Sequence, residues 1–226
     1  MSGTSDNLVD IRSRIEASCL TSGRSVDSAE LIAVSKTFSQ ARVQEAFMAG
    51  QLLFGENKIQ EAEGKILDSP SSLQWHFIGS LQRNKVRRVL KAFDVIHSID
   101  SFRLATHVDE VARDLGIRAK VFLQVNIGEE ESKGGFHVPT ILDEMMMLLQ
   151  LEHLEILGLM CIPPACANAE QARPWFVSLR TLRDNLESEF DVCLPNLSMG
   201  MSNDFEVAIE EGSTHVRVGS AIFGTR

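Results

Sequence analysis

The sequence predicts an α/β fold, namely a single (β/α)8 TIM barrel that occupies residues 1–226 and carries an extra helix at its N-terminus. Eight short apolar runs recur along the chain, and most of them lack the alternation typical of strands with one wet face. Segments with the period of an amphipathic helix separate the runs, and no linker rich in Pro, Gly or Ser divides them. A doubly wound open sheet is the alternative arrangement of the same elements.

The apolar runs are the expected strands. Parallel strands that are covered by helices on both faces are apolar throughout, and the runs fit that description. In chain order they span residues 31–35, 52–55, 76–79, 94–99, 119–127, 155–161, 196–200 and 215–219. Their spacing predicts one parallel sheet.

Helical periodicity covers the intervals between these strands. The expected helices span residues 39–50, 57–67, 81–93, 101–116, 139–150, 169–190 and 202–212. Within the second of them, Glu61 and Lys65 are spaced for an i,i+4 ion pair. A further helix at about residues 6–22 precedes the first strand. We expect it to cover the gap beside the last strand, because Arg226 follows that strand by only seven residues.

The composition is that of a packed globular protein, with 44% apolar and 23% charged residues. A formal net charge of -9 argues against general affinity for nucleic acid. No segment approaches the ~18 apolar residues of a membrane span, and "MSGTSDNLVD" lacks the pattern of a secretory signal. The cysteines, at positions 19, 161, 166 and 193, show no zinc-like spacing. These features predict a cytoplasmic protein with free thiols and no metal site.

The stretch "LIAVSKTFS", residues 31–39, ends an apolar run on Lys36. In a barrel the active face is built from the loops that follow the strands, so Lys36 is expected at the mouth of the barrel. Partial desolvation favours the neutral amine, which is a nucleophile suited to form an imine with a carbonyl group. The alternative is a rim lysine that reaches solvent or pairs with a carboxylate such as Glu56.

The loops after the last two expected strands are rich in glycine and serine. Barrels often bind a phosphate group there, because glycine lets backbone N–H groups approach an anion and serine adds a donor. The residues concerned are Ser198, Gly200, Ser202, Gly219 and Ser220. A helix expected to begin near Ser202 or Asn203 would add its first N–H groups. Together with Lys36, these loops predict a ligand with an aldehyde and a phosphate, and pyridoxal 5′-phosphate (PLP) has both.

Several motifs also occur in an order that spacing alone does not explain. They are "AVSKTFS", "FGENKIQEA", "WHFIGSLQRNK", "HSID", "GLMCIPP" and "LSMGMSNDFEVAIEEGSTHVRVGSAIFG". From about residue 31 to the C-terminus the chain closely resembles the pyridoxal phosphate homeostasis protein family, also called the proline synthase co-transcribed homologue family. The resemblance implies a monomeric barrel, similar to the N-terminal domain of alanine racemase, that holds PLP without a known enzymatic reaction. It also implies a part in PLP supply, with PLP-dependent apoenzymes as partners.

The resemblance implies a role for particular residues. Lys36 matches the Schiff-base lysine of the family, Asn57 a residue near the ring hydroxyl, and Arg217 the partner of the pyridine nitrogen. Where many relatives carry an aromatic residue after "GEN", this chain has Lys58. The loop "GEEESKGGF" retains Lys133, which the resemblance makes a candidate for a secondary PLP contact.

Further positions match the family at the phosphate and around the ring. Ser202, Gly219 and Ser220 match the phosphate-binding residues. His76 and Met201 lie in matching motifs and are also expected to bind the cofactor. For His76 a hydrogen-bonded position in the core is the alternative.

The sequence favours a PLP carrier over a PLP enzyme. PLP stabilises carbanions best when its ring nitrogen is protonated, and an arginine at Arg217 can only donate a proton in a hydrogen bond. Alanine racemases, whose N-terminal domain the resemblance involves, also use a tyrosine from a second domain as a base, whereas this chain has no tyrosine. A weak racemase or lyase, with His76 or a cysteine as the base, is the alternative.

Two further alternatives come from other functional classes. A Schiff-base aldolase without PLP would use Lys36 on a sugar phosphate. Nucleic-acid binding would use the basic run at positions 83, 85, 87, 88 and 91, which more often forms a solvated helix surface.

Overall fold

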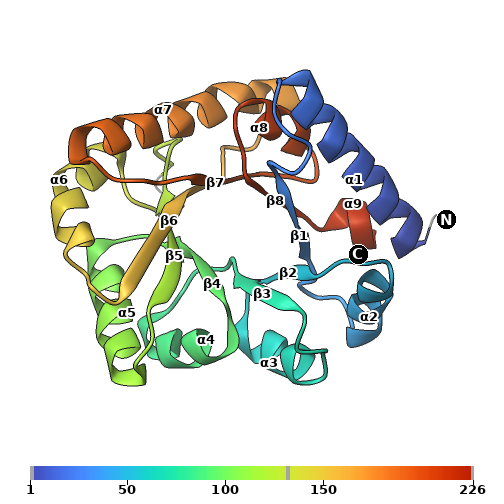
Figure 1. Ribbon diagram of the computed structural model, residues 1–226, viewed down its shortest axis with the longest axis horizontal. Helices are drawn as coiled ribbons and strands as arrows, with labels where there is room; N and C mark the ends of the chain where they lie inside the picture. The colour runs from blue at the N-terminus through green and yellow to red at the C-terminus, as the bar shows by residue number, and fades with distance from the viewer. Residues whose placement is uncertain (1–2, 131–132, 225–226) are drawn as a thin grey trace.

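In residues 3–130 and 133–224, which the computed structural model describes, eight parallel strands close into a barrel in the order β1 to β8 (Figure 1). The barrel and its ring of helices confirm the predicted fold class. The strands are Glu30–Val34 (β1), Leu53–Glu56 (β2), Gln74–Phe77 (β3), Val95–Ile99 (β4), Ala119–Val125 (β5), Leu154–Cys161 (β6), Asn196–Met201 (β7) and His215–Val218 (β8).

Helices surround the barrel on its outside (Figure 1). The α-helices are Thr4–Thr21 (α1), Gln40–Met48 (α2), Ile59–Leu67 (α3), Val86–Ala92 (α4), Phe102–Leu115 (α5), Val138–Leu149 (α6), Arg173–Phe190 (α7), Phe205–Glu210 (α8) and Ser220–Phe223 (α9). Short 3-10 helices, Arg83–Lys85 (η1) and Ala169–Ala172 (η2), precede α4 and α7. Among the described residues, no helix is long and apolar enough to cross a membrane.

The N-terminal helix covers the seam of the barrel, as the sequence predicts. Helix α9 is only four residues long, so it leaves the outer side of β8 and β1 largely uncovered. Helix α1 packs beside α9, between α8 and α2 (Figure 1). Buried Leu8, Ile11 and Ile15 lie on one face of α1 and join the main apolar core, so this helix replaces the missing cover.

The apolar core has two layers because strand side chains alternate between the barrel interior and the helices. The main cluster lies between strands and helices and includes Phe54, Trp75 and Phe77. Two smaller clusters are separate from it, one with Ile32, Val34 and Leu53 and one with Val95, Phe122 and Met160. These alternate with the main-cluster residues along their strands and therefore fill the barrel interior.

Several predicted boundaries are wrong, and the third strand and the helix before the last strand are two examples. The third strand lies at 74–77 rather than 76–79, because Gly79 has already left the sheet and lies against the backbone of Asn57. The helix expected to begin near Ser202 or Asn203 begins at Phe205. The intervening residues form a turn in which Asp204 N–H donates to the Met201 carbonyl and Met201 N–H donates to Asp204 Oδ1.

Gly158 in β6 provides a test of the packing of β6 against β7. A Cβ atom at this position would lie 1.8 Å from the Asn196 carbonyl oxygen of β7, which leaves no room for a side chain. Gly158→Ala is therefore expected to lower the free energy of unfolding by at least about 2 kcal/mol. Urea denaturation measures the change.

The matched control is Gly64→Ala in the interior of α3, where nothing lies within 4 Å of the added Cβ. This substitution is expected to raise stability by about 0.5–1 kcal/mol, because alanine has the higher helix propensity. Equal effects at the two positions would contradict the strand packing described here.

Candidate functional site

A cavity of about 1150 Å³ opens where the strands end. Residues that follow seven of the strands line it, including Lys36 after β1, Asn57 after β2 and Gly79 after β3. The rest of the wall comes from Lys133 after β5, residues 162–169 after β6, residues 201–204 around the end of β7, and residues 217, 219, 220 and 224 around and after the end of β8. This is the face of a barrel at which ligands bind.

Lys36 lies in a turn directly after β1 and is half-buried. Among the described residues its Nζ has no hydrogen-bond or ion-pair partner. The alternative pairing with Glu56 does not occur, because Glu56 pairs with Lys65 instead. Lys36 is therefore a lysine at the cavity wall whose amine is available to a ligand.

A buried ion-pair cluster supports the turn that contains Lys36. Lys65 Nζ donates to Ser35 O at 2.8 Å, to Glu56 Oε1 at 2.7 Å and to Glu61 Oε1 at 2.8 Å, which satisfies its three N–H groups. Glu61 Oε1 also accepts from the N–H of Thr37, whose φ of 69° is unusual for a β-branched residue. The ammonium group thus holds the backbone on both sides of Lys36. Burial raises the pKa of Glu56, and the Lys65 and Ser35 hydrogen bonds oppose that shift.

The loops after β7 and β8 meet at the cavity. The N–H of Gly219 donates to Ser202 Oγ at 3.2 Å, which joins the two loops. In the described part of the chain, the N–H groups of Ser202 and Asn203 have no acceptor, and Ser220 is the first residue of α9, where N–H groups lack helical partners. A Cβ at Gly219 would lie 3.2 Å from the Val34 carbonyl oxygen, so glycine permits the close approach of β8 to β1. This corner of the cavity is rich in donors.

Arg217 lies at the inner side of the cavity and is 5% exposed. Its Nη1 donates to Ser198 Oγ at 2.6 Å and its Nη2 to the Cys161 carbonyl oxygen at 2.8 Å. Burial lowers its pKa, nearby Cys161 and Asp204 partly oppose that shift, and no carboxylate of the described residues lies within ion-pair distance of its guanidinium. A buried charge without an ion-pair partner is unfavourable in a structural role. Arg217 therefore presents N–H groups at the cavity that have no acceptor among the described residues.

Other predicted residues lie at different distances from the cavity. Asn57 and Met201 line it, and Asn57 Oδ1 is a buried atom without a partner among the described residues. Lys133 also lines it, donating to the Pro163 carbonyl oxygen at 2.9 Å and pairing with Glu130; residues 131–132 of its loop lie outside the described residues. Lys58 is exposed and does not line the cavity.

His76 is not brought to the cavity. It is 5% exposed and lies inside the barrel, where its Nδ1 is 2.9 Å from Nε2 of His97. Nδ1 of His97 is in turn 2.8 Å from Ser198 Oγ. The structure therefore matches the alternative of a hydrogen-bonded core histidine. No motif in the sequence marks His97 as its partner.

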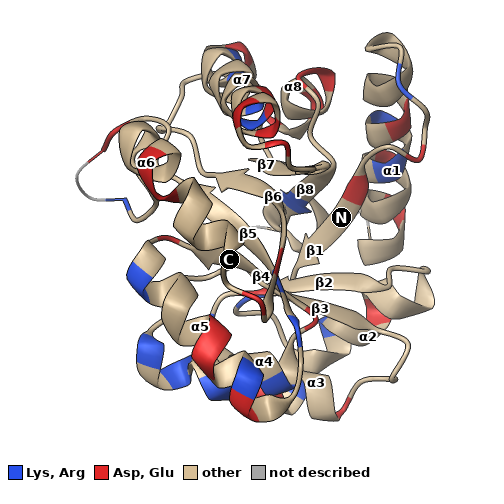
Figure 2. Cartoon of the chain, turned by 60° about the vertical axis from the view of Figure 1, so that its left-hand side comes forward, with Lys and Arg blue, Asp and Glu red and all other residues tan. Residues whose placement is uncertain are grey.

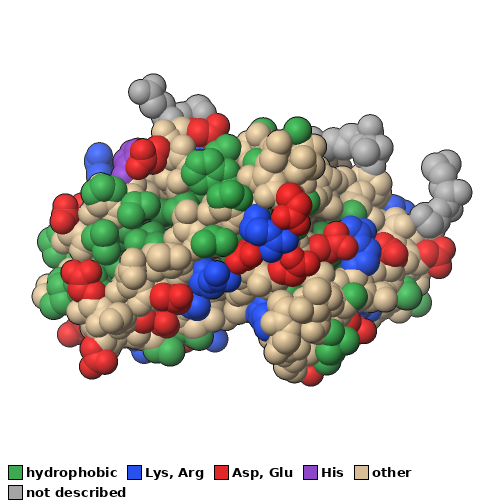
Figure 3. Space-filling view, turned by 90° about the horizontal axis from the view of Figure 1, so that it is seen from above, with side chains coloured by type: hydrophobic (Ala, Val, Ile, Leu, Met, Phe, Trp, Pro, Cys, Tyr) green, Lys and Arg blue, Asp and Glu red, His purple; other side chains and the backbone are tan. Residues whose placement is uncertain are grey.

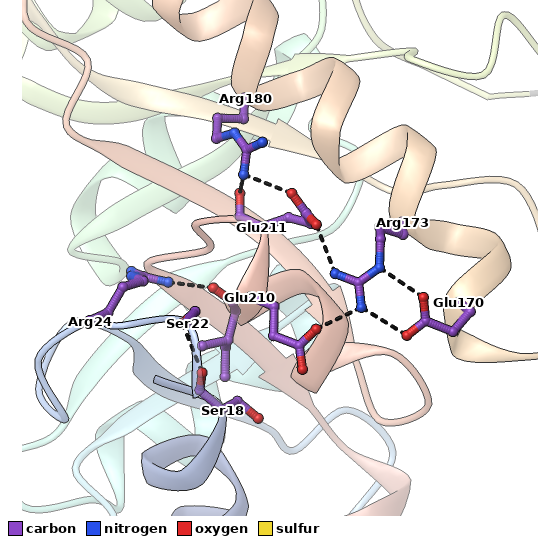
Figure 4. Close-up of polar contacts among 9 residues, drawn as sticks. Ser18, Ser22, Arg24, Glu170, Arg173, Arg180, Glu210 and Glu211 are labelled. Atoms are coloured by element: carbon purple, nitrogen blue, oxygen red, sulfur yellow. Dashed lines mark hydrogen bonds and ion pairs between the residues drawn. The ribbon is translucent and has the colours of Figure 1, made fainter. Parts of the chain in front are cut away.

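Residues 165–169 and Asp204 also line the cavity, although the sequence analysis did not single them out. The helices that follow these two loops are joined by ion pairs outside the cavity. Arg173 pairs with Glu170 at 2.8 Å, with Glu210 at 2.6 Å and with Glu211 at 2.7 Å, and Arg180 pairs with Glu211 at 2.7 Å (Figure 4). Figure 3 shows basic side chains surrounded by acidic ones on this face. The network ties η2 and α7 to α8, and so fixes the two walls that precede these helices.

The basic run of η1 and α4 is partly neutralised. Arg87 pairs with Asp114 of α5 at 2.8 Å, and Arg88 pairs with Glu63 of α3. Basic and acidic positions are interspersed on these helices (Figure 2). The described residues also contain no group of three or more His, Cys, Asp or Glu side chains that could hold a metal ion.

Comparison with known proteins agrees with this fold. Residues 12–226 match the family model described as the N-terminal domain of alanine racemase. The alanine racemase of Clostridium difficile 630 has a TM-score of 0.78 at 14% identity, and the match covers 99% of this chain and 57% of that one. At that identity the likeness concerns the fold alone. The barrel and its cavity thus define a protein of the alanine racemase N-terminal class.

Relatives with higher sequence identity show which family within this class the chain belongs to. The pyridoxal phosphate homeostasis protein of Aquifex aeolicus (strain VF5) is 42% identical over 222 residues, which cover 98% of this chain and 97% of the relative. That of Escherichia coli (strain K12) is 37% identical over 237 residues, with 100% and 98% covered. The structure of PipY of Synechococcus elongatus PCC7942 with PLP bound has a TM-score of 0.86 at 38% identity, with 98% and 100% covered. The chain belongs to the pyridoxal phosphate homeostasis protein family, which confirms the resemblance found in the sequence.

The Lys65 cluster leads to a stability prediction. Lys65→Met would leave Glu56 buried without its cation, so a loss of about 3–5 kcal/mol in the free energy of unfolding is expected. Adding Glu56→Gln to that variant should recover much of the loss. Exposed Lys58→Met is the control and should change stability by less than about 0.5 kcal/mol. Denaturant titration compares the variants, and similar values for Lys65→Met and Lys58→Met would contradict a structural role for the cluster.

The interior histidines lead to a prediction about pH. Burial lowers the pKa of His76 from 6.5 to about 3 and also lowers the pKa of His97. As pH falls below 6.5 the unfolded chain binds protons that the folded chain does not, so stability is lost as pH falls. Each histidine contributes a slope of up to about 1.4 kcal/mol per pH unit.

Unfolding free energies measured between about pH 7 and about pH 5 test this slope, because most carboxylates stay ionised there. His76→Gln should reduce the slope, because the variant lacks one of the two buried imidazoles. Stability that is constant or rises as pH falls over this range would show that the interior histidines bind protons in the folded state.

Proposed function

We propose that this chain binds PLP in the cavity as a Schiff base on Lys36 Nζ and serves intracellular PLP homeostasis and delivery, without strong catalysis of its own. The observation that carries the proposal is the combination within one cavity of an unpaired lysine, a buried unpaired arginine and a corner rich in N–H and hydroxyl groups. The names of the curated relatives and the PLP-bound structure of PipY support it.

The cavity residues fit the functional groups of PLP. Lys36 supplies the amine for the aldehyde, and Ser202, Gly219 and Ser220 supply donors for the phosphate. Arg217 donates toward the ring nitrogen. Asn57, with its buried unpartnered amide oxygen, and Met201 complete the proposed set around the ring. His76, which the sequence analysis also assigned to the cofactor, has no place in the set because it does not line the cavity.

The charge on Arg217 bears on catalysis. When bound in proteins, PLP supplies an electron sink that is strongest with a protonated ring nitrogen. The Arg217 guanidinium has no lone pair to accept a proton and can only donate, so it favours the unprotonated nitrogen. A holding role follows more readily from this donor than rapid bond cleavage at an amino acid.

A weak racemase or lyase remains the second candidate, because Cys166 is an exposed thiol that lines the cavity. Its thiol would serve as the base in place of the tyrosine that racemases use, since this chain has no tyrosine. The proposal otherwise follows the sequence: a single PLP-binding barrel domain, residues 1–226, that acts as a monomer in the cytoplasm and passes PLP to apoenzymes. The free thiols of the described cysteines are consistent with a reducing compartment.

The phosphate corner is tested by removing its hydroxyl groups. In Ser202→Ala combined with Ser220→Ala, PLP affinity should fall about tenfold or more, since hydrogen bonds to a charged group are lost. Pyridoxal, which lacks the phosphate, is the matched control ligand and should lose less than about threefold. Absorbance titrations with both ligands give the affinities, and equal losses would place the phosphate elsewhere.

The choice between carrier and enzyme is tested with L-alanine. The PLP-loaded protein should racemise it no faster than free PLP at the same concentration, as followed by chiral chromatography. Cys166→Ser should behave in the same way as the parent protein. Turnover well above that of free PLP, lost in Cys166→Ser, would establish the second candidate instead.

A further inference from the structure

A chain of hydrogen bonds runs through the barrel interior from the inner side of the cavity. Arg217 Nη1 donates to Ser198 Oγ at 2.6 Å, Ser198 Oγ is 2.8 Å from His97 Nδ1, and His97 Nε2 is 2.9 Å from His76 Nδ1. All four side chains are at least nine-tenths buried. They come from β8, β7, β4 and β3, so the chain crosses the barrel. The proposed function gives the two histidines no role.

The direction of the hydrogen bonds follows from the donor at one end. A guanidinium only donates, so Ser198 Oγ accepts from Arg217 and keeps its own proton for another partner. If His97 Nδ1 also donated to Ser198, that proton would have no acceptor among the described residues, and an unsatisfied buried hydroxyl is unfavourable. Ser198 therefore donates to His97 Nδ1. The proton of His97 is then on Nε2, and His97 donates to His76 Nδ1.

The pattern requires both imidazoles to be neutral, and their surroundings favour that state. Burial lowers the pKa of His97 and His76, and the positive charge of Arg217 lowers that of His97 further. The His97 ring also stacks on Phe122, with ring centroids 4.3 Å apart and an interplanar angle of 24°. Stacking and two hydrogen bonds leave His97 a single orientation.

We infer that His97 and His76 are positioning residues for Arg217. By accepting the Ser198 proton, His97 keeps Ser198 Oγ available to Arg217 Nη1, and His76 holds His97 in the required tautomer. Arg217 uses one N–H of Nη1 and one of Nη2 in this way, which leaves three of its five N–H groups without partners among the described residues. Those groups are held for the acceptor atom of a ligand.

The first test is NMR of the protein without PLP, labelled with nitrogen-15 in its histidines. Long-range proton–nitrogen correlations distinguish protonated from unprotonated ring nitrogens. His97 and His76 should both be neutral, with the proton on Nε2, and single substitutions assign their signals. A proton on Nδ1 of either residue would overturn the inference, whatever the protein binds.

The second test uses a pair of variants at one position. The Oδ1 of an asparagine side chain takes the place of the Nδ1 of histidine and still accepts from Ser198, whereas leucine has no acceptor. His97→Leu should weaken PLP binding about tenfold and increase solvent exchange of the Arg217 guanidinium protons, and His97→Asn should recover most of both losses. His107 lies outside this chain of hydrogen bonds, so His107→Gln should change neither PLP affinity nor guanidinium exchange.

The measurements of PLP affinity rest on the proposed function. They therefore also use 1-deaza-PLP, which has a C–H in place of the ring nitrogen. The loss of affinity in His97→Leu should occur for PLP and be absent for this analogue. Equal losses with both ligands, or equal losses in the Asn and Leu variants, would show a merely structural effect and overturn the inference. Parent protein that binds neither ligand would overturn the proposed function, while the histidine tautomers and guanidinium exchange would still decide the positioning role.

Discussion

The pairing of β1 with β8 is the constraint on which the site depends. These strands are parallel and in register, with Ile32 opposite Arg217 and Ala33 opposite Val218. Since parallel strands end at the same rim, the pairing brings Lys36, near the start of the chain, beside Gly219, near its end. The outer side of this seam has only the short α9, so α1 packs there, and Arg42 Nη2 donates to the Phe223 carbonyl oxygen. Loss of closure would separate the amine from the donor-rich corner.

Two buried cations, Lys65 and Arg217, differ in how the protein compensates their charge. Lys65 has three acceptors, two of them carboxylates, and its N–H groups are satisfied within the protein. Arg217 is equally buried but has only two neutral acceptors. Neutral oxygens compensate a desolvated guanidinium poorly, so binding of a further acceptor relieves part of the penalty. The first cation stabilises the turn of Lys36, and the second carries the poorly compensated charge on which the proposed PLP site rests.

Much of the fold could be predicted because buried parallel strands and amphipathic helices have distinct periods. Lys36 could be placed for the same reason, since a lysine that ends an apolar run belongs at the end of a strand. The start of α8 could not, because the Asp204 carboxylate closes a turn over Met201 N–H, and this turn competes with the first helical residues. The Glu61–Lys65 pair was recognised by its spacing, but its burial depends on how closely α3 approaches β1 and β2.

The histidines illustrate a further limit of the sequence. His76 lies between Trp75 and Phe77, which pack toward the helices, so the alternation of β3 turns His76 into the barrel. Its hydrogen-bond partner His97 is 21 residues away, and Ser198 is 101 residues beyond that. Only the closed barrel brings these strands together across its interior. The sequence does not contain this information, so the assignment of His76 to the cofactor rested on a family motif alone.

The most direct test of the central claim is the state of Lys36 in protein incubated with PLP. The visible spectrum is recorded before and after borohydride reduction, and the digested protein is then analysed by mass spectrometry. A yellow protein that bleaches on reduction, with a phosphopyridoxyl group on the peptide that contains Lys36, is the predicted result. A protein that stays colourless with added PLP, or that carries the group on another lysine in place of Lys36, would contradict the claim.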